Sequence, residues 1–164
     1  MSENYIVING KRAELTKGQL EALGIETKKA TPFERAKKGN IFYGISDLGG
    51  IYSWHEHGGV LQDDLFNVAN YCTDKELMQQ RALSETLNRL LWRYSMEHDG
   101  DKIILNHCWG LKCDMLNNGD IICEAYELWG HILGECVFYS KAIAQSAIKE
   151  IVKPFMKQHP EFIW

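Results

Sequence analysis

The 164-residue sequence lacks the long apolar run of a membrane span, because no stretch approaches the roughly 18 uninterrupted apolar residues that a spanning helix requires. Its N-terminus also lacks a charged region followed by an apolar core, the pattern of a secretory signal. The composition is that of an ordinary soluble protein, with 45% hydrophobic and 24% charged residues. We therefore expect a cytoplasmic protein that does not contact a membrane.

Motifs for the common catalytic chemistries are missing as well. The glycine pairs of the sequence follow neither the phosphate-loop nor the dinucleotide-binding pattern. No nucleophile elbow frames a cysteine, so a dyad of Cys108 with His107 or His131 has little support. The acidic pairs Asp63-Asp64 and Asp99/Asp101 fall in predicted turns, where aspartate is favoured for its hydrogen bonds to the backbone. We therefore expect that the protein is not an enzyme.

Cysteines are few and are not closely paired. Five lie between residues 72 and 136, and this odd number favours reduced thiols in a cytosol over a disulfide framework. Cys72, Cys123 and Cys136 fall on predicted strands, where we expect them to be small core residues.

Two histidines one residue apart raise the question of a metal site. In SWHEHGG, residues 53–59, His55 and His57 would point to the same face of a strand. Cys108 and Cys113, in NHCWGLKC, would complete a tetrahedral zinc site. No pair among them has the usual ligand spacing of about two to four residues. Zinc is therefore the candidate cofactor, and the polar end of a hairpin is the favoured interpretation.

Turn and capping patterns predict hairpins and helices in the first hundred residues. Asn9-Gly10 favours a two-residue hairpin turn, and Thr16 with Gln19 forms a capping box for a short helix. Residues 40–54 read as a second hairpin. A capping box at Thr73 then predicts a helix ending near residue 98, with these apolar residues on one face: Leu83, Leu87, Leu90, Leu91 and Tyr94.

The last third repeats this plan, with a helix capped by Ser140 and kinked or restarted at Pro154. The strands predicted before it are 103–109, 111–116, 121–128 and 132–139. We therefore predict an α+β fold, with an N-terminal β-hairpin-helix module followed by two β-meander-plus-helix units with antiparallel sheets. The corresponding segments are the module 1–27, a basic linker 28–39, and the units 40–98 and 99–164.

Charge is distributed unevenly along the chain. Residues 97–164 hold 10 acidic and 6 basic residues, whereas residues 1–96 hold 12 of each. Trp129 and Trp164 are the tryptophans that we expect to be exposed. With Trp129, the acidic residues of the predicted second sheet would offer a negative face to a basic partner: Asp114, Asp120, Glu124, Glu127 and Glu135.

The basic residues of the first half gather around the predicted linker. Such a run is usually a solvated segment, and no aromatic residue is interleaved with it as a stacking platform for bases. Contact with nucleic acid is therefore the less favoured interpretation of these residues: Lys28, Lys29, Arg35, Lys37 and Lys38.

Several pieces of the chain, including ENYIVINGKRAELTKGQLEALGIE, PFERAKKGNIFYGI and IAQSAIKEIVKPFMKQHPEFIW, resemble small accessory proteins encoded by phages and prophages of gut bacteria. The resemblance covers most of the chain and carries over no catalytic residue. It implies a setting in which inhibitors of host defences, anti-CRISPR proteins among them, are common.

The leading hypothesis is therefore a protein-binding inhibitor of a CRISPR effector such as Cas9, which blocks DNA loading by occupying a basic surface. The alternative is a nucleic-acid-binding accessory protein of phage replication or recombination. A sponge for a nucleotide signal would need a deep pocket, which a sequence cannot show.

Overall fold

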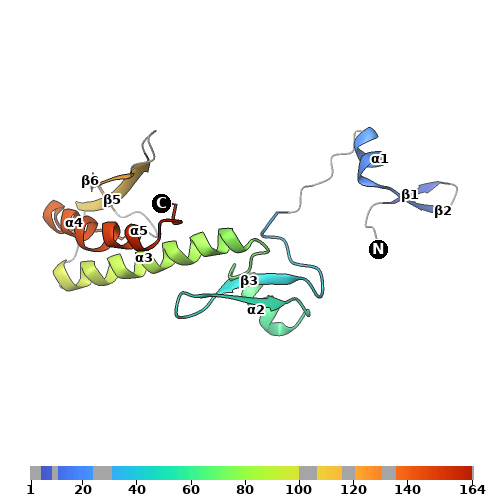
Figure 1. Ribbon diagram of the computed structural model, residues 1–164, viewed down its shortest axis with the longest axis horizontal. Helices are drawn as coiled ribbons and strands as arrows, with labels where there is room; N and C mark the ends of the chain where they lie inside the picture. Colours follow the sequence, from blue (N-terminus) through green and yellow to red (C-terminus); the bar gives the residue numbers. More distant parts are fainter. Residues whose placement is uncertain are drawn as a thin grey trace. The chain divides into compact units, whose positions relative to one another are not determined.

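The computed structural model describes residues 5–8, 11–23, 31–99, 107–115, 121–130 and 136–163 (Figure 1). The chain divides into two compact units, Met1–Glu34 and Arg35–Trp164. The predicted α+β class is confirmed, since helices occur together with three two-stranded antiparallel sheets in these ranges. The four segments expected from the sequence are a finer division than these two units and stay a prediction. None of the described helices combines the length and apolar character that crossing a bilayer requires.

The first unit is the predicted hairpin and helix. Strands β1 (Tyr5–Ile8) and β2 (Lys11–Glu14) pair antiparallel, and α1 (Lys17–Ala22) follows. Thr16 donates its backbone N–H to Oε1 of Gln19 at 2.8 Å, and Gln19 returns its own N–H to Oγ1 of Thr16 at 3.4 Å. This exchange confirms the predicted capping box. The Asn9-Gly10 turn lies outside the described residues.

The second unit begins with the predicted hairpin of β3 (Ile41–Ile45) and β4 (Ile51–His55). Each of its faces packs against a different part of the unit. On one face Phe42 is fully buried and stacks on Tyr71 at 4.2 Å between ring centroids. On the other face Ile45 joins a small hydrophobic cluster with Met78.

Helix α2 (Val60–Asn67) stands where the sequence predicted an acidic turn. Gly59 is the N-cap residue directly before the helix, and its N–H donates to Oε1 of Gln62 at 3.0 Å. Two residues after the helix, the chain turns at Ala69, a non-glycine residue with a φ of 57°. Aspartate favours turns, but here Asp63 lies in the first turn of a helix, where a negative charge is also favourable.

Helix α3 (Lys75–Asp99) is the long helix that the sequence predicted, and its cap differs by one residue. Asp74, the residue directly before the helix, accepts a hydrogen bond from the N–H of Leu77, at 3.0 Å. The predicted apolar face is confirmed, because Leu87, Leu91 and Tyr94 are buried. They form the larger hydrophobic core with residues that include Phe138, Val152 and Phe155.

The third sheet is a hairpin of β5 (Cys108–Met115) and β6 (Ile121–Leu128). The break predicted at residue 110 is wrong, because β5 runs through Gly110 without interruption. The side chains of Tyr126 and Leu128 cover this glycine, and a Cβ atom there would lie 2.8 Å from both. Of the predicted strand 132–139, the described residues 136–139 include one isolated bridge, from Phe138 to Trp109. Residues 103–106 and 131–135 lie outside the described ranges.

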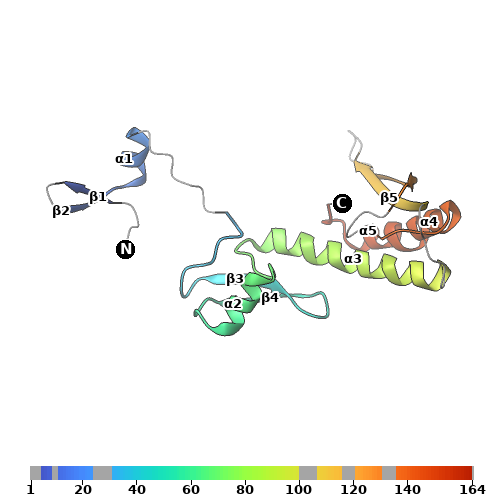
Figure 2. The ribbon, with the colours of Figure 1, turned by 180° about the vertical axis from the view of Figure 1, so that it is seen from behind.

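The chain ends in a helical run that packs beside α3 (Figures 1 and 2). It consists of α4 (Lys141–Ala147), a π-helical segment η1 (Ile148–Val152) and α5 (Lys153–Gln158). The predicted cap is confirmed, since Oγ of Ser140 accepts from the N–H of Ile143 at 3.3 Å. Pro154 cannot donate a helical hydrogen bond, and the wider π turn directly precedes it.

Candidate functional site

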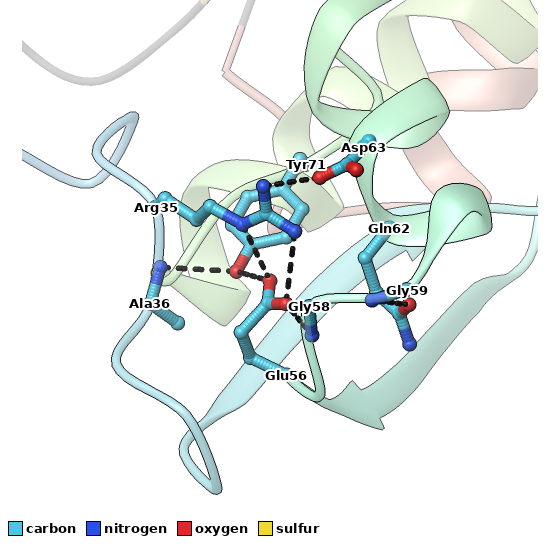
Figure 3. Close-up of polar contacts among 8 residues, drawn as sticks. All are labelled: Arg35, Ala36, Glu56, Gly58, Gly59, Gln62, Asp63 and Tyr71. Atoms are coloured by element: carbon cyan, nitrogen blue, oxygen red, sulfur yellow. Dashed lines mark hydrogen bonds and ion pairs between the residues drawn. The ribbon is translucent and has the colours of Figure 1, made fainter.

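The segment SWHEHGG is organised around its glutamate, and Figure 3 shows the polar contacts of this side chain. Glu56 is only 3% exposed, whereas His55 and His57 on either side of it are exposed. Side chains alternate between the two sides of an extended chain, so burial of the middle residue turns both neighbours outward. The hairpin interpretation of the histidines agrees with this arrangement.

Both carboxylate oxygens of Glu56 are held by two donors each. Arg35 donates from Nη2 to Oε1 at 3.0 Å and from Nε to Oε2 at 3.2 Å. The backbone N–H of Gly58 donates to Oε1 at 2.7 Å, and the Tyr71 hydroxyl donates to Oε2 at 2.8 Å. Four donors fill the roughly four acceptor positions of a carboxylate.

This buried network joins four parts of the second unit. Arg35 also forms an ion pair with Asp63 of α2 through its Nη1 atom. The N–H of Ala36 donates to the Tyr71 hydroxyl at 3.0 Å. The chain that enters the unit, the end of β4, helix α2 and the segment before α3 therefore converge on Glu56 (Figure 3).

The protonation states in the network follow from these contacts. The Arg35 hydrogen bonds, with help from Tyr71 and Gly58, outweigh burial and lower the pKa of Glu56 from 4.5 to about 2. Burial, together with the hydrogen bond to Glu56, raises the pKa of Tyr71 to about 12. Glu56 is thus an anion with saturated oxygens and Tyr71 is a neutral donor. Such a carboxylate cannot accept a substrate proton without losing a partner, so the network is an anchor for the fold.

The structure does not assemble the predicted zinc ligands. The rings of His55 and His57 lie 6.4 Å apart between centroids, a separation that does not by itself keep them from sharing an ion, so the two cysteines decide the site. Cys108 is buried, and its thiol donates to the carbonyl oxygen of Gly130 at 3.3 Å. Within the described ranges, no group of three or more His, Cys, Asp or Glu side chains is placed to hold a metal ion.

Cys113 corrects the prediction in another way, because it forms a disulfide with Cys123. The two residues are directly opposite in the β5–β6 register, with Cα atoms 4.1 Å apart. A sulfur in a disulfide is not a thiolate ligand, and the expectation of reduced thiols is wrong for this pair. A signal was present in the sequence, since the connection 117–120 between the predicted strands 111–116 and 121–128 lies midway between the two cysteines.

The predicted nucleic-acid residues are also divided by the structure. Arg35 is engaged by Glu56 and Asp63, and its assignment as a phosphate contact stays a prediction. Lys37 and Lys38 are exposed. Lys28 and Lys29 lie outside the described residues.

Of the acidic residues that the sequence placed on one face of a sheet, those that the structure describes lie on both faces of the β5–β6 hairpin. Asp114 and Glu124 lie on one face around Lys112, whose Nζ atom is 2.7 Å from Glu124 and 3.8 Å from Asp114. This ion pair lowers the pKa of Glu124. Glu127 is three residues further along β6 and therefore lies on the other face.

Trp129 agrees with the prediction that it is exposed, with 81% of its surface accessible. It follows β6 directly, and its ring lies 5.2 Å from the ring of His107. Three further predicted residues lie in parts of the chain that the structure does not describe: Asp120, Glu135 and Trp164.

Comparison with protein-family models, with curated proteins and with solved structures finds no match to this chain. Its function is therefore inferred from its own residues.

Proposed function

We propose that this protein is a phage-encoded inhibitor of a host defence effector of the Cas9 type. It binds the effector stoichiometrically and blocks DNA loading by occupying a basic surface. The observation that carries the proposal is Trp129, an indole 81% exposed at the end of β6 and two residues from the exposed carboxylate of Glu127. Large aromatic side chains beside charges are typical of the anchors of protein interfaces.

Charge on both faces of the β5–β6 hairpin supports the same kind of partner. Around Lys112, the carboxylates of Asp114 and Glu124 outnumber the single ammonium group, so this face of the hairpin retains negative charge. On the opposite face Glu127 adds a further carboxylate. A basic groove built to hold nucleic acid has the complementary potential.

The test is target-DNA cleavage by a panel of Cas9-type effectors, each incubated with the protein before or after the target DNA. Inhibition only when the protein is added first supports blocked DNA loading. The variant Asp114→Lys/Glu127→Lys should lose inhibition. The control Glu97→Lys/Glu150→Lys changes the net charge equally at exposed positions on α3 and η1 and should retain inhibition. Failure to inhibit any effector of the panel contradicts the proposal.

The alternative, a nucleic-acid-binding accessory protein of phage replication or recombination, retains Lys37 and Lys38 as exposed basic residues. It predicts retention on single-stranded DNA that falls steeply with salt, because neutralised phosphates release counterions. It also predicts that Lys37→Glu/Lys38→Glu abolishes retention. DNA binding by the unaltered chain without inhibition of any effector would favour this function.

A further inference from the structure

We propose that His107, Glu127 and Trp129 form a docking notch for an arginine side chain of a basic protein partner. This inference rests on the proposed function and identifies the chemistry by which that surface recognises its partner. The notch lies at the end of the β5–β6 hairpin where β5 begins and β6 ends.

Alternation along the strands places these side chains on one face. Trp109 and Glu127 are directly opposite in the register, and His107 and Trp129 are each two residues beyond them at the same end of the hairpin. Residues two apart on a strand point to the same side. The contacts agree, because the His107 ring lies 6.0 Å from Trp109 and 5.2 Å from Trp129.

One of the two indoles already holds a cation from the same chain. Nζ of Lys141, the first residue of α4, lies 5.3 Å from the centre of the Trp109 ring, within the range of a cation–π contact. Trp109 itself packs against the hydrophobic core. Trp129 offers the same indole surface at 81% exposure, so it can receive a cation from outside.

Glu127 supplies the charge beside this ring. Nε2 of His107 lies 2.6 Å from Oε1 of Glu127, and because a carboxylate only accepts, Nε2 carries the proton. This hydrogen bond orients a carboxylate that is 48% exposed at its side chain. The contact engages Oε1, and Oε2 can accept from a ligand.

A guanidinium group fits this pairing better than other ligands do. The flat face of a guanidinium group can stack on an indole while its N–H groups, which lie in the guanidinium plane, donate to a carboxylate at its edge. The compact ammonium group of lysine cannot make both contacts in this way. A nucleotide could stack its base on Trp129, but Glu127 would repel its phosphate group. The partner is therefore a protein segment that projects arginine.

The experiment uses the full chain and two short Gly-Ser peptides, one with two arginines and one with lysines at the same positions. Binding is followed by NMR through the indole N–H signal of Trp129, which is assigned by its loss in Trp129→Leu. The arginine peptide should shift this signal and the lysine peptide should shift it less. Glu127→Gln should weaken arginine-peptide binding by about 3- to 10-fold, the range of a surface cation–π or ion-pair contact.

Matched variants control for a general effect of charge or of aromatic surface. Trp92→Leu and Glu97→Gln remove an exposed tryptophan and an exposed carboxylate from α3, and both should leave the affinity unchanged. Equal shifts with both peptides, no shift with either, or unaltered affinity in Glu127→Gln would overturn the notch. A shift produced by oligothymidylate in place of the arginine peptide would overturn it too.

The failure of this inference can be told apart from that of the proposed function. If arginine binding is absent while the protein still inhibits a Cas9-type effector, the notch is wrong and the inhibitor function stands. If arginine binding is present but no effector is inhibited, the notch stands and its partner belongs to another system.

Discussion

Tyr71 and Glu56 share a hydrogen bond of 2.8 Å in which the tyrosine donates to a carboxylate that is 3% exposed. The same hydroxyl accepts the N–H of Ala36 at 3.0 Å. The substitution Tyr71→Phe removes both bonds and leaves a buried carboxylate with one donor fewer. We expect a loss of about 1–3 kcal/mol in the free energy of unfolding, measured by urea denaturation.

The control for this substitution is Tyr43→Phe. Tyr43 lies partly buried against the small cluster around Met78. Its hydroxyl is not part of the Glu56 network, so we expect a smaller loss. Equal losses in the two variants would show that the Tyr71 hydroxyl has no special role.

Glu56 should also make stability depend on acid pH. Its pKa is about 2 in the folded chain against an ordinary 4.5, so the carboxylate stabilises the fold fully above pH 4.5 and loses this effect as pH falls towards 2. The change should amount to about 2–3 kcal/mol at most, because Arg35 is partly solvated. Thermal unfolding at a series of pH values from about 6 to about 2, which spans both pKa values, measures this loss of stability.

The variant Glu56→Gln isolates this contribution, because its amide does not titrate. It should be less stable than the unaltered chain at neutral pH, and its stability should fall less between pH 4.5 and 2. The same acid dependence in both proteins would assign it to other carboxylates.

The Cys113–Cys123 disulfide should contribute to stability through the short loop that it closes. Replacing both residues by serine should lower the free energy of unfolding by about 2–3 kcal/mol, the effect expected for a loop of about ten residues. A reductant should do the same to the unaltered chain and have little effect on the variant.

Thiol titration of the denatured chain gives an independent measurement of the disulfide. Three free cysteines are expected before reduction and five after it, in line with Cys72, Cys108 and Cys136 as the free thiols. Five reactive thiols without a reductant would contradict the disulfide.

Gly110 should not tolerate a side chain. A Cβ atom there would lie 2.8 Å from both Tyr126 and Leu128, so Gly110→Ala forces two packed side chains to move. We expect a loss of about 1–3 kcal/mol, the usual cost of overpacking. Gly50→Ala is the control, because its added Cβ meets only Oγ of Ser46 at 3.6 Å and should change stability little.

Local signals in the sequence were sufficient for the features that depend on neighbouring residues. The Thr16–Gln19 box, the Ser140 cap and the apolar face of α3 are each formed within a few residues of chain, so their patterns are visible in the sequence. Helix α2 was missed because aspartate favours both turns and first helical turns, and only packing decides between them.

The buried network could not be found in the same way. Glu56 is separated from Arg35 by 21 residues and from Tyr71 by 15, and no local pattern links residues at such distances. The strand period alone places Glu124 and Glu127 on opposite faces of the sheet. Which residues of β5 lie beside each of them depends on the register between the two strands.

Helix α3 contributes Met78 and Ala82 to one hydrophobic cluster and Leu87, Leu91 and Tyr94 to the other. Each residue added between these two sets would rotate one set by about 100° around the helix axis relative to the other and shift it by about 1.5 Å. A single insertion near residue 84 would therefore turn one apolar face towards water, whereas an insertion of about seven residues restores the phase to within about 20°. Variation in length within α3 is thus limited to near-integral numbers of helical turns.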